Sequence, residues 1–243
     1  MSTDDDLRLS VVVPAYREGP RIATTVKELR TALHDVAEDG EAEIVVVDDG
    51  SPDDTAEQAR AAGADQVVVL PRNRGKGAAV RAGVAAARGR TIAFTDADLS
   101  YSPDQLLPLL AAVEAGGEMV AGSRRHVDTV TLVRARRGRE VSGRVFTVIT
   151  RVLLLGEDRD TQCGLKAFRA DVARDLFGRG RVEGFAFDVE LFLIARRRGY
   201  RVTEVPVAVT NVDTTTVRVG SDALRMVRDL VAMRRRARRG DYD

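Results

Sequence analysis

Apolar runs alternate with longer helix-compatible segments along the first half of the chain. Five runs consist almost entirely of β-branched and other apolar residues, which is typical of strands buried on both faces of a parallel sheet. These strands are expected at residues 9–13, 44–47, 67–70, 91–95 and 119–122. Helices are expected between them, at residues 19–36, 53–62, 77–87 and 103–115. The alternation predicts a Rossmann-like α/β fold in which helices flank a mostly parallel sheet.

The pattern changes after residue 123. Residues 124–144 contain many arginines and two glycines without a sustained hydrophobic period, which predicts a mobile loop. Regular structure is expected to resume with helices at residues 145–155 and 187–198, a strand at 200–205 and a last helix at 221–239.

The length of 243 residues, with 44% hydrophobic and 31% charged residues, fits one globular domain and excludes disordered and fibrous classes. We divide the chain into a flexible acidic N-terminus (1–6), a single domain (7–212) and a C-terminal amphipathic basic helix (213–243). The single cysteine, Cys163, excludes an intramolecular disulfide and is expected to be a small core residue.

Charge narrows the possible partners. The 38 basic and 37 acidic residues give a net charge of +1, and aromatic residues make up only 5% of the chain, so nucleic-acid binding is not expected. The acidic N-terminus lacks the features of a signal peptide, which predicts a cytoplasmic protein. Residues 145–155, the most apolar segment, fall well short of the ~20 apolar residues that span a bilayer.

The last predicted helix combines an apolar face with an arginine-rich end. Leu224, Val227, Leu230 and Val231 share one side of it. Such a helix can lie on an anionic membrane surface at the cytoplasmic face. Alternatively, it packs on the sheet and leaves a solvated basic tail. Both interpretations stay open at this stage.

Polar residues follow three of the predicted strands, where ligands of open α/β sheets bind. Asp96 and Asp98, separated by Ala97, follow the fourth strand and offer oxygen ligands suited to Mg²⁺ or Mn²⁺. A metal there would neutralise a diphosphate leaving group. The alternative is a turn that leads into the next helix.

Two further strand ends carry candidates for nucleotide recognition. The first is followed by Pro14, Ala15, Tyr16 and Glu18, and the second by Asp48 and Asp49. A carboxylate can accept hydrogen bonds from a base or ribose, and an aromatic ring can pack on a base. Taken alone, the two aspartates also fit a turn with a helix cap.

A glycine-rich segment follows the third strand. Its glycines allow backbone N–H groups and Lys76 to approach phosphate. It does not match the P-loop pattern, and no dinucleotide fingerprint follows the first strand, which weakens the ATPase and dehydrogenase alternatives.

Together these motifs resemble the family-two, inverting glycosyltransferases with the GT-A fold. The resemblance is carried by VVVPAYREG (11–19), IVVVDDGSPDDT (44–55), NRGKGAAVRAG (73–83), FTDADLSYSP (94–103) and GSR (122–124). In the second half, DTQCGLKAFR (160–169) and residues 184–207 are similar to dolichyl-phosphate glucosyltransferases and to polyprenyl-phosphate mannose synthases.

The resemblance implies transfer of a hexose, glucose before mannose, from UDP-glucose or GDP-mannose to a polyprenyl or dolichyl phosphate in glycan biosynthesis. Ala15, Asp49, Lys76 and Ala97 then belong to the donor-binding segments. The other implied contacts are Pro14, Tyr16, Glu18 and Asp48 to the nucleoside, Asp96 to ribose or metal, Asp98 to metal, Arg124 to phosphate, Gln162 and Lys166 on the acceptor side, and Asp188 and Glu190 near the sugar.

An acceptor phosphate is already an anion, so transfer to it needs positioning more than a strong base. Asp188 is therefore only the favoured candidate for a catalytic carboxylate, and Glu190, two residues further along, is the other candidate. Both residues also fit the acidic first turn of a helix.

Two positions depart from the family pattern. Leu99 stands where the eukaryotic glucosyltransferases carry glycine, and the lysine that they carry near the last helix is replaced, with Arg218 as the nearest basic residue. Two other functions remain open: a glycosyltransferase with a soluble hydroxyl acceptor, and a catalytically silent module that binds sugar nucleotides. The sequence does not decide the oligomeric state.

Overall fold

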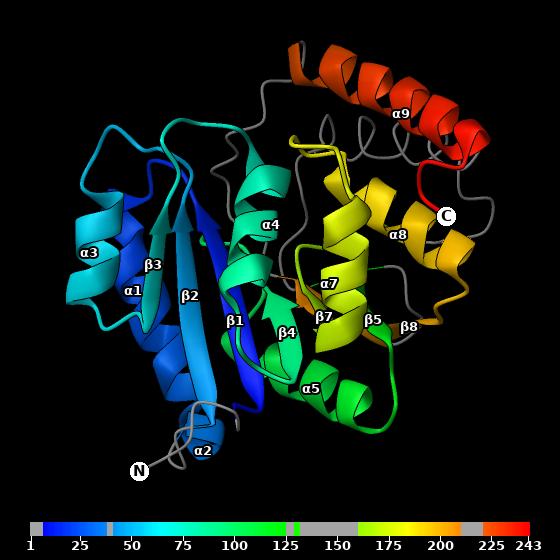
Figure 1. Ribbon diagram of the computed structural model, residues 1–243. Coiled ribbons are helices and arrows are strands. Elements are labelled where there is room, and N and C mark those ends of the chain that lie inside the picture. The colour runs from blue at the N-terminus through cyan, green and yellow to red at the C-terminus, as the bar shows by residue number, and fades with distance from the viewer. Residues whose placement is uncertain (1–6, 38–40, 125–128, 132–159, 210–220) are drawn as a thin grey trace.

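The centre of the molecule is a seven-stranded sheet with the order β3-β2-β1-β4-β7-β5-β8 (Figure 1). The computed structural model describes residues 7–37, 41–124, 129–131, 160–209 and 221–243. The predicted α/β class with a mostly parallel sheet is confirmed. The strands are β1 (Leu9–Ala15), β2 (Ala42–Asp48), β3 (Gln66–Val69), β4 (Thr91–Phe94), β5 (Met119–Ser123), β7 (Lys166–Arg169) and β8 (Val202–Pro206).

β1 lies in the interior of the sheet and pairs in parallel with β2 and β4. Its register places Val12 beside Val45 of β2 and Phe94 of β4. All residues of β1 except Pro14 are buried, as are all of β2 and β4. Burial on both faces explains why these strands are continuous apolar runs.

The sheet is not wholly parallel, because β7 runs antiparallel to both of its neighbours, β4 and β5. We did not predict this strand, whose sequence Lys-Ala-Phe-Arg is no apolar run. Nor did we predict the helix that follows it, α7 (Ala170–Arg179). Since β7 is reversed, its beginning lies at the edge where the parallel strands end.

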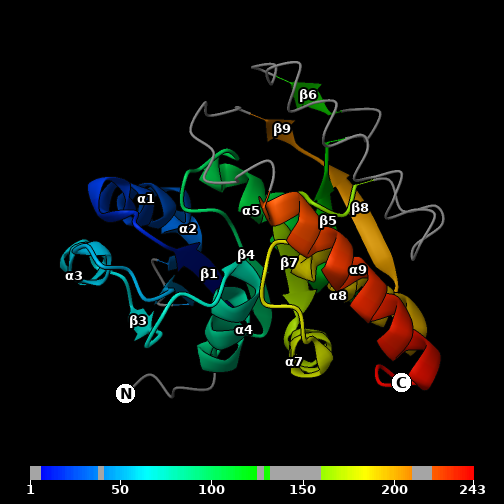
Figure 2. The ribbon, with the colours of Figure 1, turned by 90° about the horizontal axis from the view of Figure 1, so that it is seen from above.

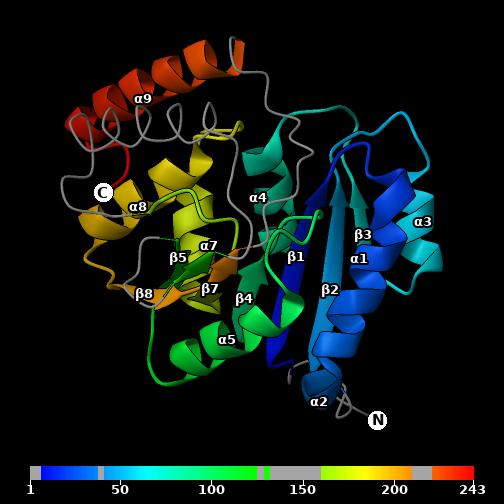
Figure 3. The same ribbon diagram turned by 180° about the vertical axis from the view of Figure 1, so that it is seen from behind.

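Helices cover both faces of the sheet (Figures 1 and 3). One face carries α4 (Lys76–Ala86), α7 and α8 (Phe187–Arg198), and the other carries α1 (Gly19–Ala32), α3 (Thr55–Ala61) and α5 (Leu106–Glu114). A single 3₁₀ turn, η1 (Pro103–Gln105), precedes α5. The helix expected at 19–36 ends at Ala32, and α2 (His34–Ala37) follows it.

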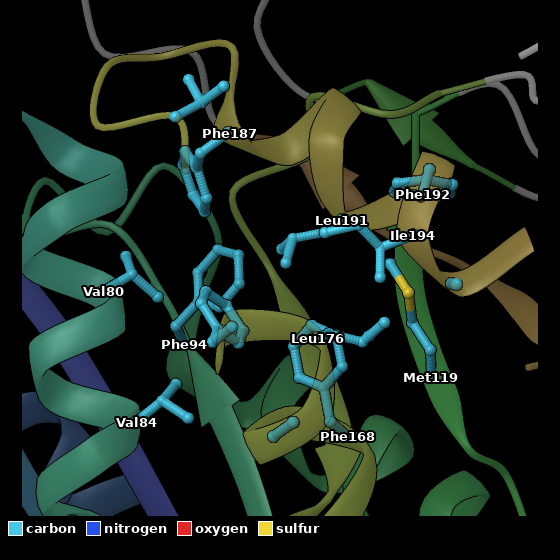
Figure 4. Close-up of a cluster of buried hydrophobic side chains, with 14 of the residues drawn as sticks. Val80, Val84, Phe94, Met119, Phe168, Leu176, Phe187, Leu191, Phe192 and Ile194 are labelled. Carbon is cyan, nitrogen blue, oxygen red and sulfur yellow. The ribbon is translucent and has the colours of Figure 1, made fainter. Parts of the chain in front are cut away.

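Aromatic rings pack in the core that lies between the sheet and the helices α7 and α8 (Figure 4). The ring of Phe94 lies 6.2 Å from that of Phe168 and 5.8 Å from that of Phe187. Burial of such a side chain stabilises the fold by roughly 1.5–3 kcal/mol. Phe94 thereby fixes β4, whose next residues carry the site, against α8.

The C-terminal helix α9 (Ser221–Arg239) lies over α8, on the side of the molecule where β1 to β3 end (Figures 1 and 2). Its apolar residues do not form the single face that we expected. Leu230 is buried, whereas Val227 and Val231 are 38% and 39% exposed. No helix among the described residues combines the length and the apolarity needed to cross a bilayer.

Part of the predicted organisation lies outside the described residues, namely the helix at 145–155 and most of the loop at 124–144. Within that loop, a short strand β6 (Val130–Thr131) pairs in parallel with β9 (Ala208–Val209). The segment is therefore not irregular throughout.

Candidate functional site

The loops after β1 and β2 are joined by hydrogen bonds. The Asp49 N–H donates to the Ala15 carbonyl at 2.8 Å, and the Arg17 N–H donates to Ser51 Oγ at 2.9 Å. Arg17 has a φ of 59°, a left-handed conformation that is uncommon for a residue other than glycine. Its guanidinium lies 5.3 Å from the ring centre of Tyr16. Tyr16 therefore sits at the sheet edge in a loop that the neighbouring strand fixes.

Asp48 and Asp49 are both buried but have different surroundings. Asp48 Oδ1 accepts a hydrogen bond from the Ser51 N–H at 2.9 Å. Asp49 accepts from the Arg74 N–H at 2.8 Å and the Gly75 N–H at 2.7 Å, one bond to each carboxylate oxygen. Burial raises the pKa of Asp49, although these two N–H groups oppose the shift. Asp49 therefore orders the loop that leads to Lys76.

Lys76 and Asp96 form an ion pair in the middle of the site. Lys76 Nζ lies 2.5 Å from Asp96 Oδ1, and the two side chains are 18% and 30% exposed. Burial opposes the charge on Lys76, but Asp96 and Asp188 outweigh it and raise its pKa. The glycine-rich segment thus places Lys76 beside the acidic residues that follow β4.

Gly164 permits the position of Asp96. A Cβ atom at residue 164 would lie 2.1 Å from Asp96 Oδ2, so any larger residue would collide with the carboxylate. Gly164 precedes β7, the antiparallel neighbour of β4. The predicted donor-side and acceptor-side motifs are therefore in contact at this point.

Asp98 follows in a tight turn. Its Oδ1 accepts a hydrogen bond from the Ser100 N–H at 3.0 Å, and the Ala97 carbonyl accepts one from Thr25 Oγ1 at 2.7 Å. Leu99 has a φ of 49°. Glycine adopts this conformation without strain, which gives a physical reason for the glycine that the related glucosyltransferases carry there.

The charge around Asp96 and Asp98 suits a divalent cation. Burial raises the pKa of Glu18 above its usual value, Arg21 opposes this shift, and Asp98 and Asp96 add to it. Glu18 Oε2 is buried without a hydrogen bond, although it lies 2.9 Å from Arg21 Nε. An excess of carboxylate oxygen is the donor set that Mg²⁺ and Mn²⁺ prefer.

The described residues contain no group of three or more acidic, histidine or cysteine side chains that could hold a metal ion. A cation at Asp96 and Asp98 would therefore need further oxygen ligands from a diphosphate and water, which is the usual coordination of Mg²⁺ at phosphate substrates. The residues fit such a metal.

Beneath the site, Lys166 and Asp188 form a buried ion pair. Lys166 is fully buried, and its Nζ lies 2.6 Å from Asp188 Oδ1 and 2.5 Å from the Cys163 carbonyl. Its ammonium also lies 5.3 Å from the ring centre of Phe94. Burial raises the pKa of Asp188, although Lys166 and Lys76 oppose the shift. Lys166 contacts Asp188 and is itself shielded from solvent.

Glu190, two residues further along α8, is 1% exposed and points to the C-terminal segment. Its Oε2 accepts hydrogen bonds from the Arg181 N–H at 2.8 Å and the Val182 N–H at 2.7 Å. Its Oε1 accepts from the Tyr242 hydroxyl at 2.5 Å. In this structure Glu190 therefore joins α8 to residues on two other segments.

Arg124 pairs with Asp160, a residue that our sequence reasoning did not single out. The Arg124 guanidinium donates to both Asp160 carboxylate oxygens at 2.7 Å, and its N–H donates at 2.9 Å. The Gln162 N–H donates to Asp160 Oδ1 at 3.3 Å. Although burial works in the opposite direction, Arg124 lowers the pKa of Asp160. The position of Asp160 in the DTQCG motif was the sequence signal that could have identified it.

The structure thus brings most of the predicted site residues to one edge of the sheet, but not all of them. Lys76, Asp96 and Asp188 interact electrostatically. Arg218 lies outside the described residues.

Comparison with known proteins is consistent with this arrangement. The family model described as glycosyl transferase family 2 matches residues 10–177. A dolichyl-phosphate beta-glucosyltransferase of Drosophila melanogaster is 36% identical over 239 residues, covering 92% of this chain and 73% of the relative. The enzyme of the same name from Homo sapiens is 33% identical over 244 residues, covering 94% and 75%.

Solved structures of similar fold include glucosyl-3-phosphoglycerate synthase from Mycobacterium tuberculosis. Its complex with Mn²⁺, uridine-diphosphate-glucose and phosphoglyceric acid has a TM-score of 0.69 and 23% sequence identity, over 94% of this chain and 80% of that one. Its complex with Mg²⁺ and uridine-diphosphate has a TM-score of 0.65 and 24% identity, over 93% and 78%. The fold is shared, and that synthase was crystallised with divalent metals.

Proposed function

This chain belongs to glycosyl transferase family 2 and is a glycosyltransferase, and from this premise we propose that it transfers glucose from UDP-glucose to dolichyl phosphate or a similar polyprenyl phosphate. The observation that carries the proposal is the contact between Asp96 and Gly164. This contact brings two parts of the chain together. One is the end of β4, which is suited to a metal ion with a bound diphosphate, and the other is the segment that resembles the acceptor side of lipid-phosphate glucosyltransferases. GDP-mannose is the donor to be tested beside UDP-glucose.

On the donor side, Pro14, Tyr16, Glu18 and Asp48 would contact the nucleoside, and Asp96 and Asp98 would hold Mg²⁺ or Mn²⁺. When bound, the metal neutralises charge on the diphosphate and so favours its departure. Lys76 pairs with Asp96 and would contribute positive charge at the same phosphates. These contacts position the anomeric carbon of the sugar.

On the acceptor side, an oxygen of the lipid phosphate attacks the anomeric carbon. The bond between that carbon and the β-phosphate oxygen of UDP breaks, UDP leaves with the electron pair, and the configuration inverts. No proton needs to be removed from the acceptor because the phosphate is already an anion at neutral pH. Arg124 and Gln162, both ordered by Asp160, would face that phosphate.

Asp188 is buried and paired with Lys166, which supports a role in orienting the sugar instead of accepting a proton. Lys166 would then act through Asp188 as a positioning residue. Glu190 would serve the same purpose at longer range, by holding α8 against its neighbours.

The proposal is tested by following labelled sugar into organic-extractable lipid. UDP-glucose and GDP-mannose are supplied separately with polyprenyl phosphate and Mg²⁺ or Mn²⁺, and Asp98→Ala is the control. We expect metal-dependent label from UDP-glucose that the variant lacks. Absence of lipid label from both donors, while UDP-glucose still binds, would contradict a lipid-phosphate acceptor.

A soluble hydroxyl acceptor is the second candidate, because a buried carboxyl with a raised pKa is suited to general-base catalysis. Asp188→Asn separates the two. Because the substitution leaves Lys166 buried without its partner, transfer is measured per protein that still binds UDP-glucose. A hydroxyl acceptor then predicts a loss of about 10²–10⁴ because the base is gone, and a phosphate acceptor predicts a smaller loss.

The proposed acceptor is a membrane lipid, so we also propose that the protein works peripherally at the cytoplasmic face of a membrane. A fractionation experiment tests this: the protein should sediment with cytoplasmic membranes and be released by high salt.

A further inference from the structure

The helix α9 has a buried face and an exposed face of different chemistry. Leu230, Met233 and Ala237 are buried in the same core cluster as α7 and α8. Arg236 also points inward, with its guanidinium 3.7 Å from Glu190 Oε1. Since these residues recur at intervals of three and four, they share one side of the helix, and this side packs against the rest of the molecule.

Beside this buried side, the helix exposes apolar residues. Of the large hydrophobic side chains exposed among the described residues, which are Val69, Val227 and Val231, two lie on α9. Val227 and Val231 are four residues apart and therefore neighbours on the helix surface. Scattered exposed valines need no explanation, but two neighbours on a helix that already has a buried face do.

Arginines surround these two valines. Six exposed arginines lie on α9 between residues 225 and 239, and no acidic side chain is exposed in this range: Arg225, Arg228, Arg234, Arg235, Arg238 and Arg239. The whole chain carries a net charge of only +1, so this concentration is local. We define Val227, Val231 and these six arginines as the arginine–valine face.

The arginine–valine face lies beside the site. A Cβ atom at Gly184 would lie 4.0 Å from Arg225 Cδ and 3.8 Å from Asp229 Oδ2, so the beginning of the described part of α9 passes over residue 184. A Cβ atom at Gly75, next to Lys76, would lie 2.6 Å from the Glu183 carbonyl oxygen. Figures 1 and 3 show α9 on the side where the parallel strands end.

We propose that the arginine–valine face binds the surface of an anionic phospholipid bilayer, with the two valines in the interface and the arginines at the lipid phosphates. This inference rests on the proposed function in one respect, namely that the membrane holds the acceptor lipid. Interfacial helices combine apolar side chains that enter the membrane interface with lysines and arginines on their polar face. Arginine suits the partner because its guanidinium pairs with phosphate in two-point contacts.

Vesicle co-sedimentation of the full-length protein tests the proposal. Vesicles of phosphatidylcholine with about one-third phosphatidylglycerol are compared with phosphatidylcholine alone, at low and high salt. Each arginine near an anionic surface strengthens binding by about fivefold, so Arg235→Gln with Arg238→Gln should weaken binding by about thirtyfold. Val227→Gln with Val231→Gln should also weaken it, but with less dependence on salt.

The matched control removes the same charge elsewhere. Arg60, on α3, and Arg201, before β8, are exposed and lie on other elements than α9, so Arg60→Gln with Arg201→Gln should bind vesicles like the wild type. Equal losses in both double variants would overturn the inference, because binding would then follow net charge alone. So would tight binding of duplex DNA through α9 without vesicle binding.

Transfer assays separate this inference from the proposed function. With a short, water-soluble polyprenyl phosphate, the α9 variants should transfer sugar at the wild-type rate, whereas with a long-chain acceptor in anionic vesicles they should be slow. Equal rates of all variants on vesicles would overturn the inference. If the wild type transfers to neither acceptor but binds vesicles through α9, the proposed function fails and the inference stands.

Discussion

Gly164 leaves just enough room for the Asp96 carboxylate. Replacing it with alanine would place Cβ 2.1 Å from Asp96 Oδ2 and force the carboxylate to move. A displacement of about 1 Å at a reacting centre costs on the order of 10² in rate. We therefore expect Gly164→Ala to lose about 10² in kcat/KM and to bind UDP-glucose more weakly, measured by steady-state kinetics and calorimetry.

Gly178 provides the matched control for this substitution. It lies within α7, and a Cβ atom there would have no atom within 4 Å. Gly178→Ala should keep full activity and gain about 0.5–1 kcal/mol of stability, because alanine favours the helix. Equal activity of the two variants would show that Asp96 tolerates displacement.

The Lys166–Asp188 pair predicts a pH-dependent loss of stability. Lys166→Met leaves a buried carboxylate without its partner, which should lower the free energy of unfolding by about 3–5 kcal/mol at neutral pH. Removing the ammonium raises the pKa of Asp188 further above its unfolded value, so the carboxyl takes up a proton as the pH falls. The loss should shrink from pH 8 to pH 5 in urea unfolding.

The double variant Lys166→Met with Asp188→Leu checks the cause. Replacing both charges with apolar side chains should recover most of the stability. If the double variant is as unstable as Lys166→Met at every pH, lost packing and not an unpaired charge explains the effect.

At the residue scale, the sequence predicted which side chains gather but not how each is used. Asp96 and Asp98 follow a strand, so their position at the sheet edge was predictable. The burial of Lys166 was not, because a lysine is rarely buried and its partner Asp188 lies 22 residues away in the chain. The orientation of the Glu190 side chain was not predictable either, because its partner Tyr242 lies 52 residues away in the chain.

At the element scale, the hydrogen bond between Tyr242 and Glu190 holds the end of α9 to α8. Tyr242 is fully buried, and burial together with Glu190 raises its pKa, so the hydroxyl remains protonated and donates at physiological pH. Tyr242→Phe should lower stability by about 2 kcal/mol because it leaves the buried Glu190 Oε1 without this hydrogen bond. Hydrogen exchange should increase in α9 and not in β1.

Tyr200→Phe is the matched control. The Tyr200 hydroxyl donates to Asp175 at 3.1 Å, and Asp175 also pairs with Arg179 and Arg198. Because that site is half-buried and the carboxylate keeps its other partners, the change should stay within about 0.5 kcal/mol. A loss in Tyr200→Phe as large as that in Tyr242→Phe would argue against a specific contribution from Glu190.

Elements with an apolar run or a strong hydrophobic period were predictable even where they are short, as in the four-residue strands β3 and β4, whereas β7 has neither signal. The helix at 187–198 and the helix at 221–239 were predicted with the bounds that α8 and α9 have. β7 was not predicted because it begins with Lys166 and ends with Arg169 instead of forming an apolar run, and it is stabilised by neighbouring strands on both sides. Tertiary context, not local propensity, makes it a strand.

At the scale of the whole molecule, the two parts of the chain share one sheet. β7, from the second part, lies between β4 and β5 of the first. A fragment of residues 1–159 would lose Phe168, Leu176, Phe187 and other buried partners of Phe94. At roughly 1.5–3 kcal/mol for each side chain, this loss exceeds the 5–15 kcal/mol by which a domain is typically stable.

We therefore expect the fragment of residues 1–159 not to unfold cooperatively in urea, as followed by circular dichroism, and not to bind UDP-glucose. The intact chain, treated identically, should show one cooperative transition. A sharp unfolding transition of the fragment, with donor affinity like that of the full chain, would show that the first part is an independent unit.

The place of β7 in the sheet also has a consequence for the newborn chain. Synthesis proceeds from the N-terminus at about 5–20 residues per second, so about 2–9 seconds pass between the end of β5 at Ser123 and the end of β7 at Arg169. During that interval β4 and β5 have emerged without the strand that separates them, and their unpaired edges are open to other chains. β7 must be synthesised before the seven-stranded sheet can form. The yield of folded protein in a cell should therefore depend on protection of the nascent chain during those seconds.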